Sequence, residues 1–158
     1  MPEQSQFGLL RERRFLPFFC TQFLGAFNDN VYKNALVIML AFHASSMLVN
    51  LCAGLFILPF FLFSATAGQF ADKYEKSTII RYVKLFEIAI MVVGVVGFMH
   101  KDLSLLIGAL FLMGLHSTIF GPVKYSILPQ HLKADEIVGG NGMVEMGTFL
   151  AILAGTIL

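Results

Sequence analysis

Five long apolar segments, separated by short polar connections, make up most of the chain. They cover residues 15–42, 48–70, 79–99, 103–120 and 143–158. An α-helix needs about 20 apolar residues to cross a hydrocarbon core, whereas a membrane β-strand needs about 10 and alternates sides. The pattern therefore predicts an all-α membrane protein with five spanning helices and no soluble domain.

The composition indicates the same class. Hydrophobic residues make up 57% of the 158 residues and charged residues only 13%, whereas soluble domains contain about 25% charged residues. The net charge of +1 gives no indication of a nucleic-acid partner. Cys20 and Cys52 match no metal or redox spacing. We expect them to lie toward opposite membrane faces, unpaired, as small apolar core residues.

Basic residues gather on one side of the predicted helices. Nine of the eleven Lys and Arg residues lie in the N-terminal stretch, around the second connection or after the fourth helix. By the positive-inside rule these parts face the cytoplasm, whereas Ser45 and Lys101 face outward. The apolar run after Arg14 is too long for a cleavable signal peptide, so the first helix is expected to stay in the mature protein.

The first segment contains an unusual group of polar residues within a spanning helix. At about 100° per residue, Gln22, Asp29 and Lys33 fall within a stripe of roughly 40°, which Asn30 and Asn34 extend to one side. Asp29 lies about 21 Å along the helix, in its outer half. Ionisable groups at such depth cost roughly 2.5–3.5 kcal/mol and normally face a bundle interior or a watery cavity. We expect these residues to face a substrate or ion; the alternative is that Asp29 and Lys33 only neutralise each other.

The connection after the second helix reads GQFADKYEK, residues 68–76. It resembles the signature loop of the major facilitator superfamily, G-x-L-A-D-[RK]-x-G-[RK]-[RK]. The matching residues are Gly68, Ala71, Asp72, Lys73 and Lys76. Glu75 and Ser77 depart from the pattern and make this loop less basic than usual. The resemblance implies that Asp72 helps to switch the transporter between conformations; the alternative is a loop of solvated charges.

Two further stretches narrow the resemblance. FGPVKYSILP follows the fourth helix at residues 120–129, and GNGMVEMGTFLAILAG covers residues 140–155. Together with TQFLGAFNDN at residues 21–30, they are similar to the bacterial lysophospholipid transporter family, some members of which are fused to a phospholipid acyltransferase. The resemblance implies a fold of twelve helices in two halves. The chain then holds the first four helices and most of a fifth, as an N-terminal fragment.

The same resemblance implies the substrate, the partners and the location. The substrate is a lysophospholipid, such as lysophosphatidylethanolamine, moved inward across the bacterial inner membrane. The partners are membrane lipid, the missing C-terminal half and an acyltransferase, fused or separate. No cofactor and no metal is implied.

Residues near the last two helices have local interpretations as well. We expect Gly121 and Pro122 to end or bend the fourth helix. Lys124 is expected at the mouth of a cavity, or else reaching toward lipid phosphate or water. Asn141 is a candidate cap of the fifth helix, and Glu145 either lines the cavity or is favoured there by the helix dipole.

Other features concern packing and excluded chemistry. Gly147, Ala151 and Gly155 form a face of small residues that lets another helix approach closely. The four histidines are expected at loops and helix ends, with no metal-ligand spacing. The acyltransferase signature H-x-x-x-x-D fails at each histidine, so an enzyme within these residues is not expected.

The sequence therefore favours a lysophospholipid transporter in which Asp29 holds an ammonium group and Lys33 or Lys124 holds a phosphate. One alternative is a drug or metabolite exporter of the same superfamily, with Asp29 as a proton-coupling site. The other is a membrane anchor for a fused acyltransferase, against which the buried charges of the first helix argue.

Overall fold

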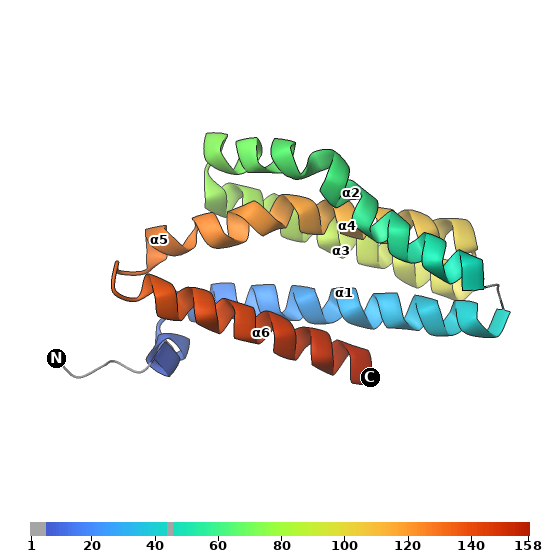
Figure 1. Cartoon of the computed structure of the whole chain (residues 1–158), viewed down its shortest axis with the longest axis horizontal. Coiled ribbons are helices and arrows are strands. Elements are labelled where there is room, and N and C mark those ends of the chain that lie inside the picture. The colour runs from blue at the N-terminus through green and yellow to red at the C-terminus, as the bar shows by residue number, and fades with distance from the viewer. Residues whose placement is uncertain (1–5, 44–45) are drawn as a thin grey trace. The chain divides into compact units, whose positions relative to one another are not determined.

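The computed structural model describes residues 6–43 and 46–158, and this part of the chain contains helices and connections but no strand. In chain order the elements are η1 (Gln6–Arg11), α1 (Leu16–His43), α2 (Ser46–Lys73), α3 (Lys76–His100), α4 (Leu103–Ser126), α5 (Leu128–His131) and α6 (Ile137–Ile157), as Figure 1 shows. Ser45, expected to face outward, lies outside the described residues.

Contacts divide the described chain into two compact units. Unit 1 comprises residues 6–34 and 124–158, and unit 2 comprises residues 35–123. Unit 1 thus contains η1, the first part of α1, α5 and α6. Unit 2 contains the end of α1, α2, α3 and nearly all of α4.

By length and composition, three helices in the described part of the chain are able to cross a membrane. They are α2 from Met47, α4 and α6. α1 and α3 are also of spanning length, at 28 and 25 residues, but they are not among these three. In α1 the polar stretch 22–34 lowers the hydropathy, because amide and charged side chains are costly in hydrocarbon.

The last two long helices differ from the sequence prediction at their ends. Gly121 and Pro122 were expected to end or bend α4. They do not end it, since α4 runs on to Ser126 with Pro122 inside it, and the bend stays a prediction. A proline removes one backbone donor, and neighbouring groups often compensate for that loss in a membrane helix. α6 begins at Ile137 with Glu136 as its N-cap, so the capping role expected of Asn141 is also wrong.

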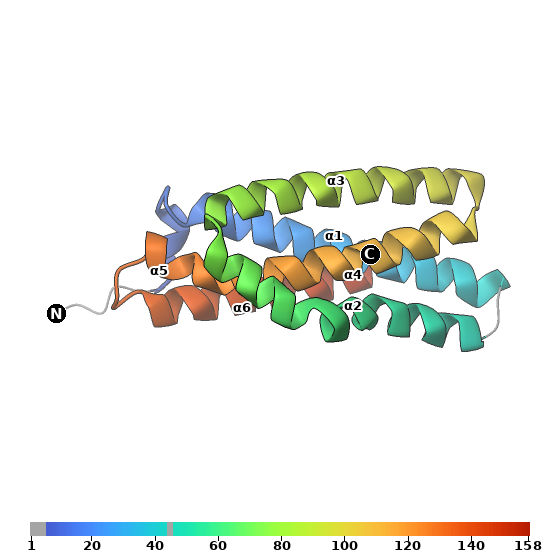
Figure 2. The ribbon, with the colours of Figure 1, turned by 90° about the horizontal axis from the view of Figure 1, so that it is seen from above.

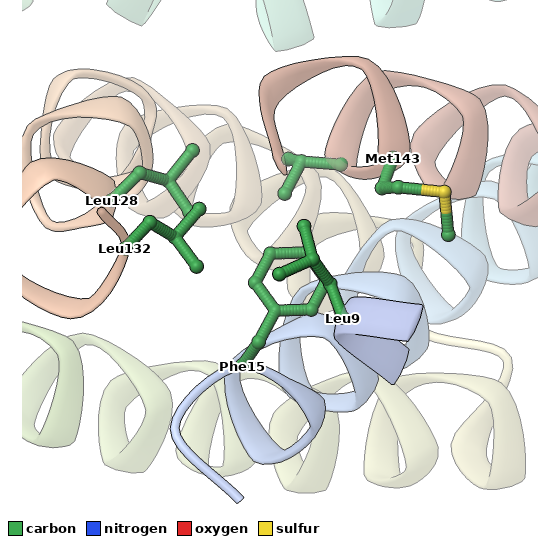
Figure 3. Packing of buried hydrophobic residues seen from close by; sticks show 6 residues of the cluster. Leu9, Phe15, Leu128, Leu132 and Met143 are labelled. Atoms are coloured by element: carbon green, nitrogen blue, oxygen red, sulfur yellow. The ribbon is translucent and has the colours of Figure 1, made fainter. Parts of the chain in front are cut away.

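Unit 1 is held together at one end by a small apolar cluster. Figure 3 shows Leu9, Phe15, Leu128, Leu132 and Met143 packed against one another. Beside it the Arg14 guanidinium donates to the Glu136 carboxylate at 2.7 Å and to the His131 carbonyl at 3.0 Å. The cluster and the ion pair fasten η1 and the start of α1 to α5 and the start of α6.

The face of small residues on α6 packs as expected. Ala151 is fully buried, and a Cβ added at Gly155 would lie 2.7 Å from the backbone oxygen of Phe27 on α1. At Gly147 an added Cβ would lie 2.6 Å from the Phe19 ring. The prediction that this face admits a neighbouring helix is confirmed, and the neighbour is α1.

In unit 2 the helices α2 and α4 approach closely as well. Gly114 of α4 lies against the backbone carbonyl of Phe56 and the ring of Pro59, with no room for a side chain. Pro59 is inside α2, and Figure 1 shows α2 changing direction partway along its length. A proline within a helix is the usual cause of such a kink.

Candidate functional site

Polar side chains of α1 are hydrogen-bonded to α6 within unit 1. The Gln22 amide nitrogen donates to the Val144 carbonyl and to the Thr148 hydroxyl, each at 2.9 Å. The Asn34 amide nitrogen donates to the Gly155 carbonyl at 2.9 Å. Because both ends of the contact advance together along the two helices, α1 and α6 run parallel, as is clear when Figure 1 is viewed together with Figure 2. Gln22, predicted to line a cavity, is therefore engaged with α6.

Asp29, Asn30 and Lys33 lie between these two hydrogen-bonded points. Asp29 is 9% exposed, and its carboxylate interacts electrostatically with the partly buried Lys33 ammonium one turn later. The Asn30 amide nitrogen donates to the Ala26 carbonyl at 2.8 Å within α1. The structure thus brings Asp29 and Lys33 together, as both the cavity interpretation and mutual neutralisation require.

A second charged group joins the end of α4 to α6. The Lys124 ammonium lies 3.4 Å from the Glu145 carboxylate, and the Tyr125 hydroxyl donates to the same carboxylate oxygen. The Lys124 ammonium also lies 4.7 Å from the centre of the Tyr125 ring. The side chain of Lys124 is 12% exposed and that of Glu145 is 42% exposed. The six predicted cavity residues therefore all fall in unit 1, and the two basic ones each have an acidic neighbour.

The loop between α2 and α3 lies in unit 2, and its two departures from the superfamily pattern form a helix cap. The Glu75 carboxylate accepts from the backbone N–H groups of Ser77 at 3.0 Å and Thr78 at 2.6 Å, and from the Ser77 hydroxyl at 2.7 Å. These hydrogen bonds lower the pKa of Glu75 to about 2. Glu75 and Ser77 thus start α3 by satisfying its free N–H groups.

The residues that match the superfamily pattern are placed around this cap. Asp72 and Lys73 are exposed at the end of α2, and Lys76 is the first residue of α3. Gly68 is half-buried one turn before Asp72, with nothing within 4 Å of an added Cβ. The switch role of these four residues stays a prediction.

Sequence reasoning missed a buried charged cluster in unit 2. The Glu87 carboxylate of α3 lies 2.6 Å from the Lys84 ammonium and 3.2 Å from Nε2 of His116 on α4. The Lys84 ammonium is 4.4 Å from the centre of the Phe120 ring, which stacks on His116. His116 was expected at a helix end, but it is 1% exposed inside α4. The available signal was a lone glutamate eleven residues into α3, one turn from a lysine.

Comparisons with known proteins give a consistent set of relatives. A family model described as Major Facilitator Superfamily matches residues 18–158. The chain is 30% identical to the lysophospholipid transporter LplT of Klebsiella pneumoniae over 93% of its own length and 36% of that protein. It is 29% identical to LplT of Cronobacter sakazakii over 99% of its length and 38% of that protein. The chain thus spans about a third of the length of these relatives. No solved structure matches it.

Proposed function

The chain belongs to the major facilitator superfamily, and from this we propose that the whole protein moves lysophospholipids across the bilayer by alternating access. Helices α1 to α4 correspond to the first four helices of the superfamily fold, and α6 corresponds to the fifth. In this fold the substrate binds between two six-helix halves. We further propose that the protein lies in the bacterial inner membrane with its N-terminal stretch and its basic connections in the cytoplasm, because these parts carry nine of the eleven Lys and Arg residues.

One observation carries the substrate assignment: unit 1 concentrates ionisable side chains of both signs within helices that are otherwise apolar. Asp29 with Lys33, and Glu145 with Lys124, are two such pairs. A zwitterionic head group presents an ammonium and a phosphate, which carboxylates and ammonium side chains bind respectively. Ionisable residues deep in a spanning helix, as Asp29 and Lys33 are in α1, are costly, and they are retained where they line a cavity or a substrate path.

The proposed roles follow from these pairs. Asp29 holds the substrate ammonium, and Lys33 or Lys124 holds the phosphate. Glu145 neutralises Lys124 while no phosphate is bound. The two groups lie 3.4 Å apart, and a competing anion is able to break this ion pair. Gln22 fixes α1 on α6, which positions the acidic and basic groups relative to each other.

The test uses the full-length protein in vesicles, with Asp29→Asn alone and together with Lys33→Gln. If Asp29 binds substrate, the single variant inserts and melts normally in detergent but loses lysophospholipid uptake, and the double variant does not recover it. If the pair is only structural, the single variant leaves a charge unpaired and is destabilised by roughly 3–5 kcal/mol. Recovery of both melting temperature and uptake in the double variant contradicts the proposed role.

The loop between α2 and α3 supplies a second test of the transport cycle. We propose that Asp72 biases the balance between inward-open and outward-open states. Asp72→Asn should then slow uptake while expression stays normal, since a change of about 1.4 kcal/mol alters that balance tenfold. Unchanged uptake, with unchanged thiol accessibility on both membrane faces, would leave Asp72 as a solvated charge.

Transport of other substrates is tested in the same vesicles. Lysophosphatidylethanolamine uptake is measured in competition with a panel of organic cations. Competition by cations without lysophospholipid uptake would indicate a drug exporter instead. If the full-length protein carries a fused acyltransferase, acyltransferase activity without lysophospholipid uptake would indicate that the helices only anchor that enzyme.

A further inference from the structure

An apolar groove opens on unit 2 between α2, α3 and α4. Its volume is about 500 Å³. All of its lining residues belong to unit 2, so the groove is defined independently of unit 1. Aromatic and aliphatic side chains make up most of the lining, among them Phe63, Phe70, Tyr82, Phe86, Leu115 and Ile119.

The lining of the groove determines what it is able to bind. Phe70 is 51% exposed and Tyr82 is 70% exposed, so large apolar surfaces face outward along the groove. Water has few polar partners along most of this lining and does not fill it favourably. Since α2 and α4 are of membrane-spanning length and composition, we take the groove to lie at the depth of the bilayer hydrocarbon. A lipid acyl chain matches this surface.

Polar and basic groups lie at one end of the groove. Tyr74 and Thr78 line it where α2 passes into α3. The Lys73 ammonium lies 5.6 Å from the centre of the Tyr74 ring, which places a positive charge beside the lining. Lys76 and Arg81 follow in the first turns of α3. Basic residues where helices leave the membrane attract the anionic phosphates of lipids, and tyrosines favour the same depth.

We propose that unit 2 binds a membrane phospholipid with an anionic head group, one acyl chain lying in the groove and the phosphate beside Lys73. The bound lipid is a resident of the leaflet on the basic side and is distinct from the transported substrate. Its site therefore does not depend on the proposed transport function. The groove supplies the apolar contact area, and the basic end supplies the charge complementarity.

The experiment uses the full-length protein in phosphatidylcholine vesicles containing a small fraction of phosphatidylglycerol with a photoreactive diazirine on one acyl chain. After illumination, mass spectrometry locates and quantifies the labelled residues. The label should fall on groove residues such as Phe70 and Tyr82 and should saturate as the probe fraction rises. The proposal is overturned if the amount of label rises linearly with the probe fraction and is spread evenly over exposed apolar residues.

Filling the groove provides the decisive variant. Thr66 is exposed and lines the groove, so Thr66→Trp fills it with little risk to folding. Leu62, one turn earlier on α2, is 58% exposed and does not line the groove, so Leu62→Trp is the matched control. Labelling should fall about tenfold in Thr66→Trp, because excluding even two methylenes of the acyl chain from the groove weakens lipid binding by about that factor. It should stay within about twofold of the parent in Leu62→Trp. Equal labelling in the two variants overturns the proposal.

Two additional measurements test the head group and rival occupants. Lys73→Gln should reduce phosphatidylglycerol labelling severalfold. It should reduce labelling by a matched diazirine phosphatidylcholine less, because the choline ammonium balances the charge of that phosphate. A photoreactive amino acid at Thr66 should crosslink to lipid. A crosslink to a later segment of the same protein, or to a second copy, shows that protein fills the groove and overturns the proposal.

Discussion

Replacing Glu87 by leucine removes the shared partner of a buried cluster while keeping the apolar volume of the site. Its carboxylate is 2.6 Å from the Lys84 ammonium and 3.2 Å from His116 Nε2, and the three side chains are at most 18% exposed. Removing one partner of a buried ion pair costs about 3–5 kcal/mol. The Lys84 ammonium keeps its contact with the Phe120 ring at 4.4 Å, which is worth about 0.5–2 kcal/mol. We therefore expect the lower end of the range, about 3 kcal/mol, or roughly a hundredfold in the unfolding equilibrium.

The measurement is the free energy of unfolding of the full-length protein in mixed detergent micelles, followed by titration with a denaturing detergent. A second variant carries Glu87→Leu together with Lys84→Leu. Because apolar residues often replace a buried ion pair at no net cost, the double variant should recover most of the lost stability. A single variant within about 0.5 kcal/mol of the parent, or a double variant as unstable as the single one, would refute this reasoning.

Three further predictions concern packing, capping and topology. Gly155→Ala should lower the melting temperature in detergent, because the added Cβ lies 2.7 Å from a backbone oxygen of α1. Gly108→Ala is the control: nothing lies within 4 Å of its added Cβ, so the melting temperature should stay the same or rise. The pKa of Glu75 is about 2, below its usual 4.5. Its capping therefore stabilises the protein fully above pH 4.5, and this stabilisation is lost as the pH falls through 2. In Glu75→Gln the loss of stability between pH 4.5 and pH 2 should be smaller than in the parent. Single cysteines at Lys76 and Lys101, in a chain without native cysteines, should react with an impermeant thiol reagent from outside intact cells only at position 101, and the opposite result contradicts the orientation.

The sequence was sufficient to predict helices and faces but not their pairing across the fold. Apolar length predicted α1, α2 and α3 to within three residues, because helix formation in hydrocarbon is dictated by local composition. The spacing of Gly147 and Gly155 predicted a close helix contact, which the structure assigns to α1. The chain order alone does not reveal that Glu87 meets His116, since these residues lie on different helices.

The interpretation of single residues in the site also depends on which helix packs against them. Gln22 shares a stripe with Asp29, and the stripe alone does not say that the Gln22 amide reaches Val144 and Thr148. Cys20 was expected in the core but is exposed, whereas Cys52 is buried as expected. In both cases the outcome depends on which neighbour covers the helix face, and periodicity does not contain that information.

The hydrogen bonds between α1 and α6 have a consequence for how the protein is made. Asp29 and Lys33 each add about 2.5–3.5 kcal/mol to the insertion of α1, and a leucine or isoleucine returns only about 0.3–0.6 kcal/mol. The groups that satisfy Gln22 and Asn34 are 122 and 121 residues further along the chain. When α1 leaves the ribosome, its partner helix has not been synthesised. We therefore expect α1 to become stably seated in the bilayer only after α6 has been made, which would make its final placement a late step of biogenesis.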